Sequence, residues 1–103
     1  MHVSDALDKI EQYTVDLTFE AFMRDAKCND AILFQLSVIG EAIKHVDNEI
    51  LARYEYPWHM VRAQRNVIAH DYFGIRMDKI WSVVRDDLPD LKAMINRVLE
   101  NEF

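Results

Sequence analysis

The sequence predicts an all-α protein, and three observations support that prediction. Only two glycines and two prolines occur in 103 residues, which is typical of helices rather than of turn-rich β-sandwiches or barrels. Apolar residues recur at spacings of three and four over several stretches, the period of an amphipathic helix. Residues with capping side chains precede most of those stretches. We therefore expect one domain over residues 1–103, an antiparallel helical bundle of four main helices plus short additional helices.

Two helices are expected before residue 25. The first begins at a Ser4 or Asp5 cap. Its inward stripe, with spacings of 4, 3, 4 and 3, consists of Val3, Leu7, Ile10, Thr14 and Leu17. Thr18 is expected to cap a short segment that ends at Arg24. The side chains of this segment that should fold onto the bundle are Phe19, Phe22 and Met23.

A long central helix is predicted next, beginning at an Asn29 or Asp30 cap. Its main apolar stripe is Ile32, Leu36, Ile39, Ile43, Val46 and Ile50, and a second stripe is Leu33, Phe34, Val38 and Ala42. A helix that is apolar over so wide an arc fits between its own bundle and a partner. The pair Asp47-Asn48 is a candidate break before Arg53.

Three helices are predicted in the second half of the chain. Pro57 suits the first position of the third main helix. That helix should turn Trp58, Val61 and Ile68 inward, with Met60 and Val67 nearby. Gly74 is its expected stop. The fourth helix then has Met77, Ile80, Trp81, Val84 and Leu88, and Pro89 opens a fifth with Leu91, Ile95 and Val98 inward.

Charge and cysteine content narrow the setting and the partners. The formal net charge of −6 at pH 7 disfavours non-specific coating of nucleic acid. The window 57–76 is nevertheless net basic, since Arg62, Arg65 and Arg76 are opposed by Asp71 alone. Cys28 is the single cysteine and cannot form an internal disulfide, so a reducing cytoplasm is the expected setting. We expect no signal peptide and no membrane span, and hence a soluble protein.

Chemically active side chains gather between Arg65 and Tyr72, in the sequence RNVIAHDY. Arg binds phosphate oxygens through a bidentate fork, His moves a proton near neutral pH, and Asn can orient either group. On a helix Arg62, Asn66 and His70 form one stripe, whereas Arg65 points about 140° away from His70. One helix therefore does not bring all these groups to one substrate. A second copy around a two-fold axis could bring in the missing Arg or His.

The spacing of Arg65, His70 and Tyr72 resembles the R-x4-H-x-Y signature of the HEPN superfamily, in the form carried by HepT-like toxins. The similarity covers essentially the whole chain and includes Ile39-Gly40-Glu41-Ala42, Pro57-Trp58, Tyr72-Phe73-Gly74, Ile80-Trp81 and Leu88-Pro89. It implies a small all-α homodimer that acts as a metal-independent endoribonuclease on RNA, without a cofactor. It also implies the toxin half of a toxin–antitoxin pair, encoded beside a minimal nucleotidyltransferase antitoxin that transfers AMP to Tyr72.

On this hypothesis the catalytic residues are Arg65, Asn66 and His70. His70 would be the general base or acid on the ribose 2′-OH or the leaving oxygen, and Arg65 would stabilise the charge that builds at phosphorus. Asn66 would orient one of them. Glu41 and Arg62 are the expected supporting residues, because a Glu41–Arg65 ion pair would orient the guanidinium.

Plainer roles exist for the same residues. His70 could only favour the negative end of the helix dipole, and Arg65 could be a purely structural partner of Glu41. Glu41 and His45, at i and i+4, could chelate a metal, but no second ligand pair supports such a site. Gly40 within a helix indicates a close approach of another helix.

Two further alternatives concern the position of Tyr72 and the function of the whole chain. Tyr72 and Phe73 would by default be core aromatics, whereas the resemblance puts the phenol of Tyr72 at the rim of a cleft. The alternative function is a non-catalytic helical adaptor that binds a nucleotide or the nucleotidyltransferase through the same cleft.

Overall fold

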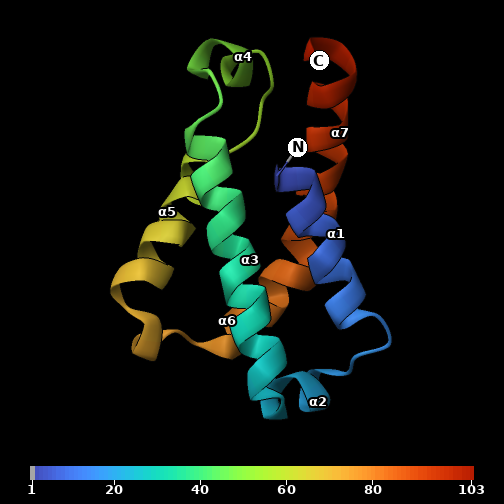
Figure 1. The fold of residues 1–103 in the computed structure, drawn as a ribbon, viewed down its shortest axis with the longest axis vertical. Helices are drawn as coiled ribbons and strands as arrows, with labels where there is room; N and C mark the ends of the chain where they lie inside the picture. The colour runs from blue at the N-terminus through green and yellow to red at the C-terminus, as the bar shows by residue number, and fades with distance from the viewer. Residues whose placement is uncertain (1) are drawn as a thin grey trace.

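In the computed structural model, which describes residues 2–103, every regular element is a helix or a helical turn, as the sequence predicts (Figure 1). The elements are α1 (His2–Thr14), α2 (Phe19–Arg24), α3 (Ala26–Lys44), α4 (Asn48–Ala52), α5 (Trp58–His70), the 3-10 turn η1 (Tyr72–Gly74), α6 (Met77–Ser82), the π-helical turn η2 (Val83–Asp87) and α7 (Leu88–Glu102). Over these residues no helix is long and apolar enough to cross a membrane.

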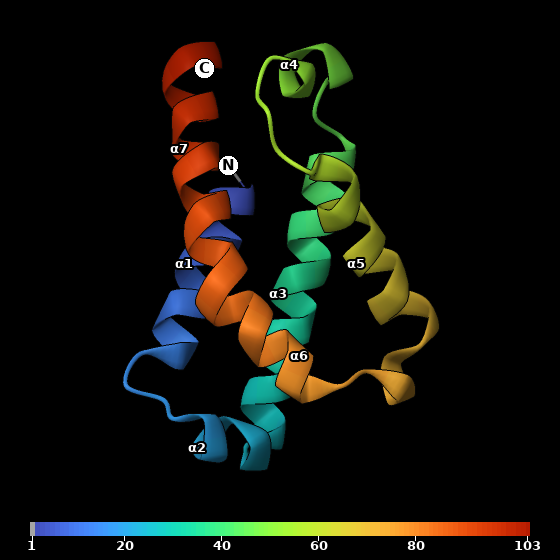
Figure 2. The same cartoon turned by 180° about the vertical axis from the view of Figure 1, so that it is seen from behind.

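Helix α3 is the centre of the bundle. Its most extensive contacts are with α5 on one side and α1 on the other, and α7 packs in turn against α1 (Figures 1 and 2). The core contains fully buried side chains from α1, α2, α3 and α7: Val3, Ile10, Phe22, Ile32, Leu36, Ile39, Ile43, Ile95 and Val98. Nearly all of them belong to the stripes that the sequence spacing predicts.

Two of the predicted starting points are wrong because the helix begins earlier. Helix α1 begins at His2, so Ser4 and Asp5 lie inside its first turn, where the carboxylate suits the positive end of the helix dipole. Helix α3 begins at Ala26, because the side chain of Asp25 accepts a hydrogen bond from the Cys28 N–H at 3.0 Å. Asn29 and Asp30 therefore lie within the helix and are not its cap.

Two other predicted boundaries are confirmed by their hydrogen bonds. Thr18 caps α2 by accepting from the Ala21 N–H at 3.1 Å. The break at Asp47-Asn48 is real, since Asp47 caps the short helix α4 by accepting from the Glu49 N–H at 2.8 Å. Pro57 is the residue that precedes α5 rather than its first residue.

Several apolar side chains that were expected inside lie at the surface. Of the three candidates on α2 only Phe22 is buried, while Phe19 and Met23 are exposed. On α3 the second stripe is covered unevenly. Leu33 is 3% exposed and Val38 and Ala42 are half-buried, whereas Phe34 is 64% exposed, on the helix for which the sequence analysis expects a partner. In Figure 1 no other element is drawn in front of α3.

The fourth and fifth predicted helices are not separate. Elements α6, η2 and α7 follow one another without a loop and form one bent rod from Met77 to Glu102 (Figure 2). Pro89 has no N–H to donate to the preceding turn, and its ring crowds the carbonyl four residues back. A wider π-helical turn just before it absorbs that defect while the chain stays helical.

Candidate active site on helices α3 and α5

The candidate site is built where α3 and α5 approach most closely, at Gly40. A Cβ atom placed on Gly40 would lie 2.4 Å from the Cβ of Arg65 and 3.1 Å from the carbonyl oxygen of Val61. No side chain fits at these distances without moving a helix, so the absence of one lets α5 lie against α3. The close approach inferred from the sequence is confirmed, and it fixes the stem of Arg65 directly against α3.

An ion pair then orients the guanidinium. Arg65 Nε lies 3.3 Å from Glu41 Oε2, and Glu41 Oε1 accepts a hydrogen bond from His45 Nε2 at 3.1 Å. Glu41 Oε2 is enclosed and makes no hydrogen bond within residues 2–103, so the charge of Arg65 is what balances it. The hydrogen bond from His45, together with the charges of Arg65 and Lys44, lowers the pKa of Glu41 despite its partial desolvation.

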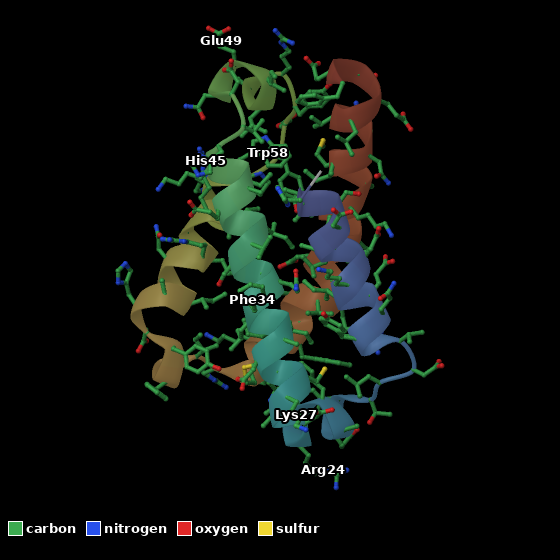
Figure 3. All side chains as sticks on the ribbon, viewed as in Figure 1. Arg24, Lys27, Phe34, His45, Glu49 and Trp58 are labelled. Carbon is green, nitrogen blue, oxygen red and sulfur yellow. The ribbon has the colours of Figure 1, made fainter. Side chains whose placement is uncertain are left out.

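Arg65 and Glu41 also line a groove of about 410 Å³ on the open face of α3. The other lining residues are His2, Ser37, Val38, Ala42 and His45. His45 lies near the end of α3 on the side of α5 (Figure 3). The floor is therefore apolar, with one guanidinium, one carboxylate and two imidazoles at its edge.

The remaining motif residues divide between this groove and the end of α5. Arg65 Nη1 donates a hydrogen bond to Asn66 Oδ1 at 3.2 Å, so Asn66 holds a second edge of the guanidinium. Arg62 turns instead toward α4, with its Nη1 3.4 Å from Asn48 Oδ1. His70 is the last residue of α5, is exposed, and does not line the groove of Arg65. Within one chain Arg65 and His70 thus stay apart, in agreement with their helical spacing.

Tyr72 makes a contact that the sequence did not indicate. Its hydroxyl donates a hydrogen bond to Asp30 Oδ1, in the second turn of α3. The pKa of Tyr72 is raised, first by this hydrogen bond, then by desolvation, and then by the negative charge of Asp30. Tyr72 is 42% exposed and Phe73 is 100% exposed, so neither is the core aromatic that a helix end would suggest.

The alternative that Glu41 and His45 chelate a metal has no geometric support in the described chain. Glu41 and His45 do lie together, but no third His, Cys, Asp or Glu joins them as a ligand among residues 2–103. Glu41 already contacts His45 through Oε1 and Arg65 through Oε2, so neither carboxylate oxygen is left for a metal ion.

Comparison with known proteins places this arrangement in a wider group. The model of a family described as "Ribonuclease HepT-like" matches residues 3–98. A Thermococcus cleftensis protein described as "Probable ribonuclease HepT" is 32% identical over 97 residues, which is 93% of this chain and 88% of that protein. A Methanocaldococcus jannaschii protein described as "Gamma-glutamylcyclotransferase and putative RNase" is 33% identical over 100 residues. This chain spans only 45% of the length of that second relative. No solved structure gives a significant match.

Proposed function

Because the chain belongs to the HepT-like ribonuclease family, we propose that it is a metal-independent endoribonuclease whose catalytic residues are Arg65, Asn66 and His70. The observation that supports this most directly is the orientation of Arg65. Its stem is pinned at Gly40 and its guanidinium is held by Glu41 at 3.3 Å and by Asn66 at 3.2 Å. A preorganised cation at the edge of a groove suits the binding of a phosphate whose charge increases during reaction.

The proposed reaction needs only proton transfer and charge stabilisation. The ribose 2′-oxygen attacks the adjacent phosphorus, the bond from phosphorus to the 5′-oxygen breaks, and a 2′,3′-cyclic phosphate and a 5′-hydroxyl form. His70 suits removal of the 2′-OH proton or protonation of the 5′-oxygen, because an imidazole titrates near neutral pH. Arg65 would neutralise the charge on the phosphoryl oxygens, while Asn66 and Glu41 position it.

A second copy of the chain is the partner that would complete this site. Arg65 and His70 do not meet within one chain, and the face of α3 beside Arg65 is apolar, with Val38 and Ala42 half-buried and Phe34 exposed. An isologous contact through this face would bury those side chains and bring the end of one α5 toward the groove of the other. We therefore propose a homodimer with a composite site, in which the two copies of His70 can share the roles of base and acid.

Cleavage of RNA in the presence of EDTA is the test of this function. His70→Ala should abolish cleavage while the helical circular dichroism is kept, and the free energy of unfolding should change by no more than about 1 kcal/mol, since His70 is exposed. His59→Ala is a matched control, because it removes an exposed histidine from the first turn of the same helix. Full activity of His70→Ala would refute the proposed role. Wild-type protein that cleaves no RNA would favour the non-catalytic adaptor instead.

We further propose that the protein is the toxin of a toxin–antitoxin pair and that a minimal nucleotidyltransferase neutralises it. In that step the phenolic oxygen of Tyr72 attacks the α-phosphorus of ATP, pyrophosphate leaves, and AMP stays on the tyrosine. Exposure of Tyr72 supports access by another enzyme, and Asp30 is placed to accept the phenolic proton. The added phosphate would repel RNA phosphate near Arg65 and His70.

A further inference from the structure

A second, smaller cavity lies beside the motif, between the first turns of α3 and the turn η1. Its volume is about 230 Å³, and its walls include Asn29, Asp30, Leu33, Tyr72 and Phe73. Pockets for drug-sized ligands occupy about 300–1,000 Å³. A space slightly below that range suits one planar ring system better than a whole cofactor. Tyr72, in the wall of this cavity, follows His70 by only two residues along the chain. A ligand in the cavity would therefore lie near the end of α5, which carries the proposed catalytic histidine.

Phe73 gives this cavity an aromatic wall. Its side chain is 100% exposed, although burying a phenylalanine is worth about 1.5–3 kcal/mol. The ring meets the ring of Tyr72 edge to face at a centroid distance of 5.5 Å. An exposed aromatic ring is the feature on which single-stranded nucleic acid stacks its bases.

The exposed polar group at this cavity is the carboxylate of Asp30, which is a hydrogen-bond acceptor. Asp30 Oδ1 accepts from the Tyr72 hydroxyl, and Oδ2 accepts from no group in the described chain. Each carboxylate oxygen has two lone-pair sites, so both oxygens can take a further donor. Two acceptor atoms on one carboxylate call for a ligand edge with two adjacent donors.

We propose that this cavity is a nucleobase subsite that prefers guanine, with Phe73 stacking on the ring and the carboxylate of Asp30 accepting from its Watson–Crick edge. Guanine carries N1–H and N2–H₂ side by side. Adenine and cytosine each place a ring-nitrogen acceptor beside their amino group, and uracil has one N–H between two carbonyls. Those three bases would bring a lone pair against the carboxylate of Asp30. The subsite deepens the proposed function by giving the cleavage a base preference.

Binding of mononucleotides to the full-length protein tests the subsite without requiring cleavage. Nuclear magnetic resonance titrations with GMP, AMP, CMP and UMP should show the tightest binding for GMP, with the largest shifts at Phe73 and Gly74. Phe73→Ala should weaken GMP binding about tenfold, the loss of one stacked base, and Phe73→Tyr should restore it. Asp30→Asn should remove the preference for GMP over AMP. Phe103→Ala and Asp86→Asn are matched controls, since each alters an exposed side chain of the same type elsewhere.

Equal binding of the four nucleotides, or GMP binding that survives Phe73→Ala, would overturn the proposal. Mapping the cleavage sites on a mixed-sequence RNA separates this failure from failure of the proposed function. Cleavage next to guanine that becomes indiscriminate in Phe73→Ala supports both. Cleavage with no base bias in the wild type would refute the guanine subsite and support the ribonuclease function. Guanine-selective binding without any cleavage would support the subsite and refute the ribonuclease function.

Discussion

Replacing Gly40 with alanine tests whether the close approach of α3 and α5 holds the candidate site together. The new methyl group would lie 2.4 Å from the Cβ of Arg65 and 3.1 Å from the carbonyl oxygen of Val61. Neither neighbour is the free end of a flexible side chain, so one of the helices has to shift. Arg65 would then move away from Glu41, whose oxygen is now 3.3 Å from its Nε.

The expected loss of stability can be worked from two opposing contributions. Overpacking a helix contact costs about 1–3 kcal/mol, and alanine in place of glycine within a helix gains about 1 kcal/mol. The net destabilisation is therefore about 1 kcal/mol, which lowers the Tm of a chain of this size by about 4–8 °C. Because the guanidinium is displaced, RNA cleavage should fall far more than stability.

Thermal and urea unfolding followed by circular dichroism, at equal protein concentrations, measure this change. Gly74→Ala is the matched control. The atoms nearest to its added Cβ would be those of the Asp71 carboxylate, with both oxygens at 2.5 Å, and that side chain is exposed and can turn away. A Gly40→Ala protein that is about 1 kcal/mol more stable than the wild type, and fully active, would show that the methyl group fits and would refute the reasoning.

Three other predictions follow from the same geometry. Phe34→Asp puts a charge on the exposed side of α3 and should turn a dimer into a folded monomer, as measured by sedimentation equilibrium at low micromolar concentration. The control Phe103→Asp should leave the dimer intact. A wild-type protein that is already a stable monomer would contradict the composite site. The hydrogen bond to Asp30 raises the pKa of the Tyr72 phenol above the ordinary 10.0. The contribution of this phenol to stability is therefore complete below about pH 10 and is lost as the pH rises through the folded-state pKa. Asp30→Asn should lower the pKa in a phenolate absorbance titration, and an unchanged pKa would exclude Asp30 as the cause. If a minimal nucleotidyltransferase is the antitoxin, as proposed above, co-expression with it should add whole AMP units to Tyr72 and stop RNA cleavage, and Tyr72→Phe should remain toxic. Suppression of activity with unmodified Tyr72 would mean inhibition by complex formation.

Features that depend on local sequence were largely predictable. Thr18 and Asp47 cap helices because their side chains reach an N–H two or three residues away, and such contacts depend only on nearby residues. The pairing of Glu41 with Arg65 was predictable for another reason. A carboxylate on an apolar helix needs a partner, and Gly40 beside it marks where the next helix comes close.

Features set by distant parts of the chain were not predictable. The bond between Tyr72 and Asp30 joins residues 42 positions apart, and no periodicity indicates it. Periodicity also places apolar residues on a face without telling what covers that face, which is why Phe19 and Met23 were expected to fold onto the bundle although both are exposed. At Pro89 the usual signal for a helix start was misleading, because the preceding turn could widen and let the rod continue.

That widened turn has a rotational consequence for the whole bundle. Each residue of an α-helix advances the side-chain direction by 100°, and the π-helical turn at Val83–Asp87 accommodates roughly one residue more than an α-turn would. Everything after it is therefore set back in phase by about the angle of one residue. This offset lets a single rod face α2 with its α6 half and α1 with its α7 half. Deleting one residue between Val83 and Asp87 would restore the ordinary phase and turn Ile95 away from α1, so the bundle depends on the length of this turn more than on the identity of any exposed residue within it.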